Sequence, residues 1–267
     1  MFADDYPQAI AYLEADRLRH LVHLKFLHLY PDVVGGMYAK VGGETAILLD
    51  YPTQTASKDA SSYPDAQQIY LPVASGEAAA RCLIAQIQQS APAHFAVKFC
   101  DPLTRDLFLN TFGLQYARTV ISYTISARES LPPPDQSVRV VTELDDAHAS
   151  LYARNEYPRG DLEHYFADGA QSFSIYEGAE LVCSCFAFRN FGHVWEIAGL
   201  HTLDHARRKG YARQVVIAAL DTLVKTNRVP RYQAESHNTA SMQLAESLGL
   251  TCCLRFEHFL SPGQDFS

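Results

Sequence analysis

At 267 residues, the chain has room for one large domain or two of ordinary size. Hydrophobic residues make up 48% and charged residues 19%, which supports a substantial core and excludes an intrinsically disordered chain. The net charge of −8 argues against a protein that binds nucleic acid over a broad face, and it is compatible with a cationic or amine partner.

The cysteines and the start of the sequence bear on the compartment. The six cysteines form no C-x-x-C pair and no zinc-type spacing, so we expect free thiols in a reducing compartment, with Cys183 and Cys185 on one face of a strand. The first residues show no signal-peptide pattern, and no apolar run approaches the length of a membrane span. We expect a cytoplasmic protein with no membrane partner.

The first half alternates helical and strand patterns. Residues 6–29 read as one helix, because leucines recur at helical spacing until Tyr30-Pro31. His20, His23 and His28 on this segment are interpreted as surface or packing residues, and no metal site is expected. Strands are then predicted at 45–50, 69–74, 95–99 and 116–126, helices at 76–89 and 104–112, and a long loop at 51–68, with Gly113 ending the second helix.

A proline-rich segment divides the chain. Residues 127–137 contain three consecutive prolines, which fit neither a helix nor a central strand, so they are predicted to link a domain at 1–126 to a domain at 138–267. In the second half, helices are predicted at 145–155, 160–167 and 239–248, and a further helix starts at Tyr211 or Ala212. Strands are predicted at 172–177, 180–189, 194–203, 231–236 and 252–260.

The two halves resemble each other. A displacement of 136 positions lays Gly113 on Gly249 and the strand at Thr45 on the strand at Leu181. With this displacement, both halves show the same order of elements: a strand, a polar turn, a helix, a Gly-Leu pair and another strand. This indicates an internal duplication, although two α/β patterns can also agree by accident. Either way, the fold class is α/β with mixed sheets.

A basic loop, residues 204–210, joins the strand at 194–203 to the next helix. The first amides of a helix lack internal partners, and the helix dipole adds positive charge there, so this end of a helix suits an anion. Gly210 lets the backbone approach a phosphate, and Arg207, Arg208, Lys209 and Arg213 add charge. The alternative is a solvated basic helix start.

Two motifs identify a family. Arg-x-x-Gly-x-Ala at 207–212 lies between a strand and a helix, and Asn-x-x-Ser at 238–241 is followed by Leu-Ala-Glu-Ser-Leu-Gly-Leu at 244–250. With this order and spacing, residues 138–260 resemble the GNAT superfamily of acyl-CoA-dependent N-acyltransferases. The resemblance implies two tandem GNAT-like domains, each a twisted, mostly antiparallel sheet flanked by helices. The first would be degenerate, because its corresponding turn, residues 73–77, has an acidic Glu77 and no arginine.

The resemblance also implies acetyl-CoA as cosubstrate. In the family the first motif holds the pyrophosphate, the preceding strand contacts the pantetheine arm, and that strand then separates from its neighbour to admit the thioester. Carried over by motif, the expected binding residues are Leu200, His201, Thr202, Arg207, Arg208, Lys209, Gly210, Tyr211, Ala212, Arg213, Asn238 and Ser241. Asn238 has an alternative interpretation as the N-cap of the following helix.

Glu196 is the expected catalytic residue. It stands eleven residues before Arg207, where the family often carries a glutamate, and burial beside Trp195 and Ile197 would raise its pKa towards that of a general base acting through water. The alternative is a glutamate that binds the substrate cation or an internal arginine. Backbone amides near Leu200 would polarise the thioester carbonyl. Many family members have a tyrosine where this chain has Ala245, so the general acid stays open between Ser241, Tyr211 and water.

The predicted function is therefore N-acetyl transfer to a primary amine by direct attack, with no covalent intermediate and no metal. A small-molecule amine is favoured over a protein lysine, because a second domain tends to enclose the site. Acidic residues and aromatics at Glu156, Tyr157, Asp161 and Glu163 would suit a cation, as would any surface helix. Two alternatives remain, a non-catalytic acetyl-CoA-binding module and an aminoacyl-tRNA-dependent transferase. The oligomeric state is open, a homodimer included.

Overall fold

The computed structural model describes residues 6–125 and 131–262. The chain forms two compact units: unit 1 comprises the residues up to Val120 together with those from Leu254 onward, and unit 2 is Ile121–Cys253. The division runs through two strands, β5 (Gln115–Thr124) and β11 (Thr251–Leu260). The end of β5 therefore belongs to unit 2, and the end of β11 belongs to unit 1. Ser126 and residues 127–130 of the predicted linker lie outside the described residues.

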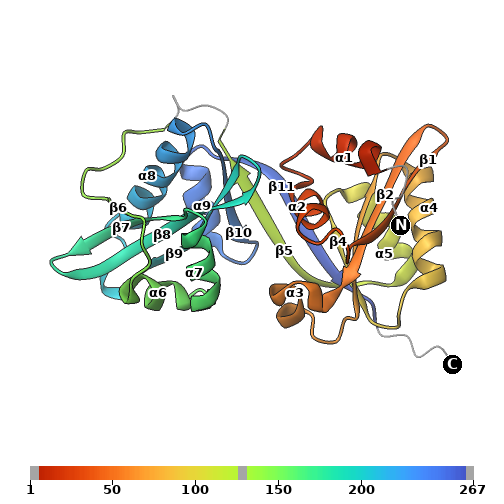
Figure 1. The fold of residues 1–267 in the computed structure, drawn as a ribbon, viewed down its shortest axis with the longest axis horizontal. Coiled ribbons are helices and arrows are strands. Elements are labelled where there is room, and N and C mark those ends of the chain that lie inside the picture. Colours follow the sequence, from red (N-terminus) through yellow and green to blue (C-terminus); the bar gives the residue numbers. More distant parts are fainter. Residues whose placement is uncertain (1–5, 126–130, 263–267) are drawn as a thin grey trace. The chain divides into compact units, whose positions relative to one another are not determined.

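Unit 1 is built on a mixed sheet with the strand order β1-β2-β3-β4-β11. In chain order its elements are α1 (Tyr6–Glu14), α2 (Leu21–Leu29), β1 (Gly35–Val41), β2 (Glu44–Pro52), α3 (Ser57–Ser62), β3 (Gln68–Ala74), α4 (Glu77–Ser90), β4 (Phe95–Phe99) and α5 (Pro102–Phe112). Neighbouring strands are antiparallel except for β3 and β4 (Figure 1). α4 and α5 pack their apolar faces on the sheet in one core with Val97, Phe99 and Phe259.

Three sequence predictions in unit 1 were wrong. The single helix at 6–29 is two helices, because leucine spacings of three to five residues fit two short helices joined by a turn as well as one long one. The long loop at 51–68 contains a 3-10 turn and α3. Strand β1 was missed, since it opens with two glycines and its residues are nearly all half-buried, which hides the usual alternation.

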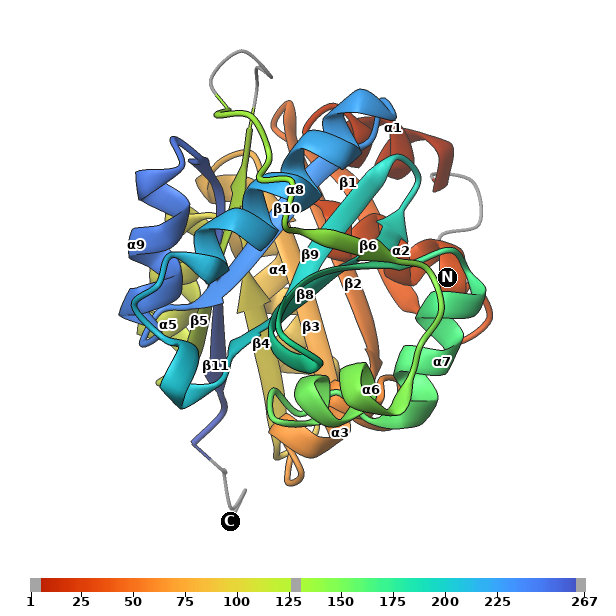
Figure 2. The ribbon, with the colours of Figure 1, turned by 90° about the vertical axis from the view of Figure 1, so that its left-hand side faces the viewer.

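Unit 2 has the strand order β6-β7-β8-β9-β10-β5. Its elements are β6 (Arg139–Val141), α6 (Asp146–Ala153), α7 (Arg159–Ala167), β7 (Gln171–Glu177), β8 (Glu180–Phe191), β9 (Val194–Thr202), α8 (Tyr211–Lys225), β10 (Val229–Glu235) and α9 (Thr239–Ser247). The pairs from β6 to β9 are antiparallel, whereas β9 and β10 are parallel. Figure 2 shows α8 on one side of these strands and α6 and α7 on the other.

Alternation along β9 assigns its side chains to the two faces. Trp195 and Ile197 pack with the buried residues of α8, and Ala198 packs with the cluster beneath α6 and α7. Cys183 and Cys185 share the α8 face, as predicted, and all six cysteines are free. None of the helices in the described part of the chain combines the length and apolar character that crossing a bilayer requires.

The internal repeat is visible in the elements. Three pairs of strands begin 136 positions apart, β1 and β7 at residues 35 and 171, β2 and β8 at 44 and 180, and β5 and β11 at 115 and 251. Gly113 and Gly249 both follow a helix and both have a left-handed φ, of 63° and 73°. The structure therefore repeats the order that the sequence comparison of the two halves predicted.

Candidate functional site

The candidate site lies in unit 2, where β9 leaves the sheet ladder. β9 pairs with β8 at Ala198↔Phe186 and next at His201↔Ser184, so two residues of β9 stand opposite one residue of β8. Gly199 lies in this bulge with φ of 63°, and a Cβ there would be 2.5 Å from a ring carbon of Phe186. The parallel ladder with β10 covers residues 194–197 and 229–232. Beyond it the two strands separate, as the resemblance predicted.

The predicted pantetheine strand lies past this separation. The Leu200 carbonyl accepts a hydrogen bond from Asn155 Nδ2 at 3.1 Å, so the end of α6 holds the backbone of β9. The Thr202 carbonyl accepts from Arg207 Nε at 3.3 Å, and the Thr202 hydroxyl contacts Cys183 Sγ at 3.1 Å. Burial, with the charges of Arg154 and Arg207, lowers the pKa of His201, which favours the neutral imidazole.

The basic loop leads into an uncapped helix. After a 3-10 turn (Asp204–Ala206), Arg208 and Gly210 both take left-handed φ values, of 64° and 82°. Gly210 is the N-cap of the 15-residue α8 and makes no side-chain capping bond, and nothing lies within 4 Å of the position that a Cβ would take. Because no side chain of the N-cap residue pairs with the first amides of the helix, this end of α8 is suited to an anion.

Two of the expected binding residues share an acidic partner. Glu177, at the end of β7, accepts from Lys209 Nζ at 2.7 Å and from the Tyr211 hydroxyl at 2.8 Å. These two hydrogen bonds, that of Lys209 first, lower the pKa of Glu177. The sequence analysis missed Glu177, since only the tertiary fold places β7 beside this loop.

The two arginines of the loop and Arg213, in the first turn of α8, differ in what they contact. Arg207 pairs with Asp204 at 2.9 Å, and Arg213 Nη1 donates to the Ser247 carbonyl at 3.2 Å and hydroxyl at 3.0 Å, which ties α8 to the end of α9. Within the described residues Arg208 has no ion pair, so its charge is available to a ligand. Ala212 is half-buried in the first turn of α8 and leaves the backbone beside it accessible.

Glu196 is buried, at 8% exposure, and both of its carboxylate oxygens have partners. Oε2 pairs with Arg231 Nη1 at 3.0 Å and accepts from Asn190 Nδ2 at 2.7 Å. In the amide orientation that satisfies its neighbours, Gln233 donates to Oε1 at 3.0 Å and accepts from Arg231 Nη2 at 2.6 Å. The internal arginine that sequence reasoning left as an alternative is therefore present.

The second motif caps α9. Asn238 Oδ1 accepts from the Ser241 amide at 3.1 Å, so the N-cap interpretation of Asn238 is confirmed, and only its Nδ2 is left for a ligand. The Ser241 hydroxyl is hydrogen-bonded to Tyr232, whose pKa is raised to about 12 by burial. Tyr232 occupies the last paired position of β10, opposite Ile197. Ala245 is fully buried.

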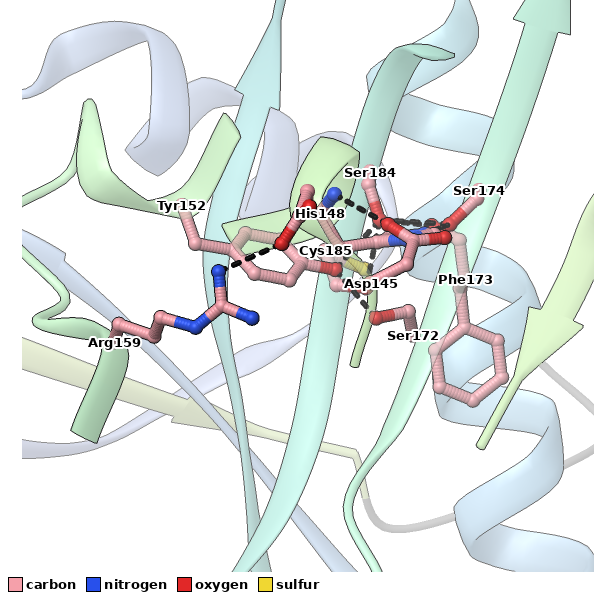
Figure 3. Close-up of polar contacts among 10 residues, drawn as sticks. Asp145, His148, Tyr152, Arg159, Ser172, Phe173, Ser174, Ser184 and Cys185 are labelled. Carbon is pink, nitrogen blue, oxygen red and sulfur yellow. Dashed lines mark hydrogen bonds and ion pairs between the residues drawn. The ribbon is translucent and has the colours of Figure 1, made fainter. Parts of the chain in front are cut away.

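A buried chain of hydrogen bonds lies between α6 and strands β7 and β8 (Figure 3). Asp145 Oδ1 contacts His148 Nδ1 at 2.8 Å, and His148 Nε2 contacts Ser174 Oγ at 2.9 Å. Ser174 continues to Ser184 at 2.9 Å, and Ser184 continues to the Tyr152 hydroxyl at 2.7 Å. His148 and both serines are fully buried.

This chain has the order of an Asp-His-Ser triad, which the sequence analysis did not find, because its members lie on a helix and two strands far apart in sequence. Ser174 offers no exposed oxygen to a substrate and is bonded on both sides. The chain therefore supports α6 rather than supplying a nucleophile. The only sequence signal for this network is a pair of alternate serines, Ser172 and Ser174, on β7, together with a histidine on the earlier helix α6.

Residues 155–259 match the family model described as GNAT acetyltransferase. The chain contains a GNAT acetyltransferase domain. This match identifies unit 2 as an acyltransferase, and it covers the bulge, the basic loop, Glu196 and the Asn238 motif. GNAT enzymes as a family use acetyl-CoA or another acyl-CoA. No curated protein matches the sequence.

Solved structures extend the likeness to both halves of the chain. An acetyltransferase of the GNAT family from Colwellia psychrerythraea is 12% identical with a TM-score of 0.62, covering 98% of this chain and 97% of its own. A tandem GNAT protein from the clavulanic acid biosynthesis pathway is 10% identical with a TM-score of 0.56, covering 93% and 89%. A GCN5-related N-acetyltransferase from Sphaerobacter thermophilus is 12% identical with a TM-score of 0.57, covering 85% and 83%. At these identities the likeness shows the fold, and the tandem GNAT protein agrees with the internal repeat.

Proposed function

We propose that the protein transfers the acetyl group of acetyl-CoA to a primary amine of a small molecule. The observation that carries the proposal is the path of the backbone in unit 2, which runs from the part of β9 beyond its ladder with β10 through the basic loop to the uncapped N-terminus of α8. An extended ligand with an anionic end fits such a path, because unpaired strand amides can bind its chain and helix amides its phosphates.

The residues of the path fit acetyl-CoA. The backbone of Gly210 and the first residues of α8 would bind the pyrophosphate, with Arg207 and Arg208 adding charge. The Lys209 ammonium stays beside Glu177 and contributes less, and Arg213 acts by holding α9. The backbone of Leu200, His201 and Thr202 would contact the pantetheine arm, with Asn238 Nδ2 near it.

The chemistry requires a proton acceptor and a proton donor. As the amine nitrogen bonds to the acetyl carbon, the carbon–sulfur bond breaks, the nitrogen gives up a proton and the thiolate gains one. Glu196 would accept the first proton through a water, and the backbone near Leu200 would polarise the carbonyl. With Ala245 in place of the tyrosine of other GNAT enzymes, the donor of the second proton is left open between Ser241, Tyr211 and water.

The acceptor would bind on the face that Glu196 shares with α6 and α7. Tyr157 lies close enough for the charge of Glu196, after burial itself, to raise its pKa. Glu156 is exposed, takes a left-handed φ of 62°, and follows Asn155, which holds the Leu200 carbonyl. A carboxylate in this strained position suits an ammonium group.

One observation favours a second candidate function, a non-catalytic acetyl-CoA-binding module. All of the hydrogen-bonding partners of Glu196 described above are internal, so the carboxylate could serve the fold alone. Release of CoA thiol with a panel of primary amines decides between the two. If Glu196 is the base, Glu196→Gln lowers kcat by at least ~100-fold and leaves the KM for acetyl-CoA nearly unchanged.

The control for that measurement is Glu77→Gln, which removes a surface partner of Arg81 on α4 in unit 1 and should leave turnover unchanged. Tight acetyl-CoA binding with no thiol release for any amine would establish the binding module. Full turnover in Glu196→Gln would overturn the role of Glu196.

A further inference from the structure

Three potential metal ligands meet in unit 1, outside the GNAT acetyltransferase domain. His20 precedes the first residue of α2, His23 follows one turn later, and Cys100 stands just after β4. Their ligand atoms all lie within 4.8 Å of one another, and Cys100 Sγ is 3.8 Å from His20 Nδ1. Exposure is 5% for His20, 0% for His23 and 7% for Cys100.

His23 is the residue that a packing role does not explain. Both of its ring nitrogens are buried and have no hydrogen-bond partner among the described residues. A buried polar atom left unpaired destabilises a fold by ~1–3 kcal/mol, so such atoms are rare without a ligand. Burial lowers the pKa of His23 well below its ordinary value and that of His20 to about 4.

One of the three distances between the ligand atoms is close to that in a tetrahedral site. Zinc–nitrogen bonds of ~2.0–2.1 Å and zinc–sulfur bonds of ~2.3 Å place nitrogen and sulfur ligands roughly 3.5 Å apart. The observed 3.8 Å between Cys100 Sγ and His20 Nδ1 needs only a small closure. Two histidines three residues apart at a helix start lie on one side of the helix, with side chains directed the same way.

We propose that His20, His23 and Cys100 bind one zinc-like divalent ion that fastens α2 to the end of β4. A sulfur and two imidazoles form a set that zinc prefers over magnesium or calcium. On binding, the sulfur–hydrogen bond of Cys100 is replaced by a sulfur–metal bond, and the proton is released to solvent. The fourth position is left to water.

The proposal differs, for two of the three histidines, from the sequence-based expectation that they are surface or packing residues. His28 is exposed, whereas His20 and His23 meet a cysteine that comes 77 positions after His23, which no local spacing could show. The proposed ion is structural, since the site lies in unit 1 and none of its ligands belongs to the GNAT acetyltransferase domain.

The test is metal binding by the full chain, prepared with a chelator and then titrated with Zn²⁺ and, separately, with Co²⁺. We expect one ion per chain, a thiolate-to-cobalt charge-transfer band, and a higher unfolding temperature with Zn²⁺. Cys100→Ser should abolish the band and weaken Zn²⁺ binding by at least ~100-fold. Loss of a residue that only supports a ligand weakens metal binding by ~10–100-fold, so a larger effect indicates a direct ligand. The control Cys82→Ser, on α4, should leave both unchanged.

His23→Gln provides a second variant in case Cys100→Ser does not fold, with His28→Gln as its control at the other end of α2. Loss of the bound ion in either site variant, with the controls intact, supports the proposal. A wild-type chain that gives no cobalt–thiolate band, or variants that bind Zn²⁺ as tightly as the wild type, would overturn it. Neither readout depends on acetyl transfer.

Discussion

The pair of Glu196 and Arg231 allows a quantitative prediction about unit 2. Arg231 is 2% exposed and Glu196 is 8% exposed, so neither charge can turn to solvent when the other is removed. Loss of one partner of a buried pair typically costs ~3–5 kcal/mol, because the remaining charge stays buried and uncompensated. We therefore expect Arg231→Met to lower the free energy of unfolding by ~3–5 kcal/mol.

Substitution of the other partner, Glu196, should lower the free energy of unfolding by less. In Glu196→Gln the side chain can still accept the hydrogen bond from Asn190, so we expect a loss of ~1.5–3 kcal/mol. In the double variant no isolated charge remains, and its destabilisation should fall short of the sum of the two single effects by ~1–3 kcal/mol. The surface pair of Arg189 and Asp168 supplies the control, since both side chains are about half exposed and Arg189→Met should cost ~0–1 kcal/mol.

The assay is urea unfolding of the full chain followed by tryptophan fluorescence. Trp195 is the single tryptophan, is 6% exposed, and lies next to Glu196 in β9, so its signal reports the unfolding of unit 2. Strict additivity of the two single variants in the double variant would refute the reasoning. So would an Arg231→Met cost no larger than that of Arg189→Met.

Three further predictions concern the loop, the bulge and unit 1. Gly199→Ala should destabilise unit 2 and abolish acetyl-CoA binding. The control Gly178→Ala, with the same φ of 63° but no neighbour within 4 Å of the added Cβ, should cost only the backbone strain of ~1 kcal/mol. Urea unfolding measures the stability of the two variants, and calorimetric titration measures their acetyl-CoA binding. Glu177→Gln should tighten acetyl-CoA binding, most at low ionic strength, because it removes a negative charge beside Lys209; unchanged affinity at low salt would contradict this. With chelator present, unit 1 should lose stability as the pH falls below ~6.5, by up to ~1.4 kcal/mol per pH unit for each of His20 and His23, because their lowered pKa values mean that the unfolded state binds more protons than the folded state. Circular dichroism of unfolding measures this dependence, and His23→Leu should make it less steep. An equal slope in that variant would contradict the prediction.

Much of the fold followed from local pattern. Strands such as β4 and helices such as α5 and α8 were predicted within a few residues, because their hydrophobic period and their glycine ends are local signals. The boundary between α1 and α2, and the half-buried β1, were not, since tertiary packing decides them. The strand before the basic loop, the helix that starts after Gly210 and the N-cap interpretation of Asn238 were predicted correctly, because each is a short segment in which sequence spacing fixes geometry.

Most contacts of the site residues with other elements could not be predicted from the sequence. Glu177 meets Lys209 across 32 positions, and Arg231 meets Glu196 across 35, through strands whose pairing the sequence does not state. The same holds for His148 with Ser174 and for His23 with Cys100. Sequence spacing predicts what one element presents, whereas contacts between elements depend on sheet order and register.

Isothermal titration of the full chain with acetyl-CoA tests the central claim most directly, when repeated on Arg207→Ala/Gly210→Asp. Aspartate tolerates the left-handed φ of Gly210, so this variant should fold while placing a negative side chain in the open space before α8. We predict micromolar binding at one site per chain for the wild type and none for the variant, with Trp195 fluorescence confirming that it is folded. No binding by the wild type, or equal binding by the variant, would contradict the proposed acetyl-CoA site.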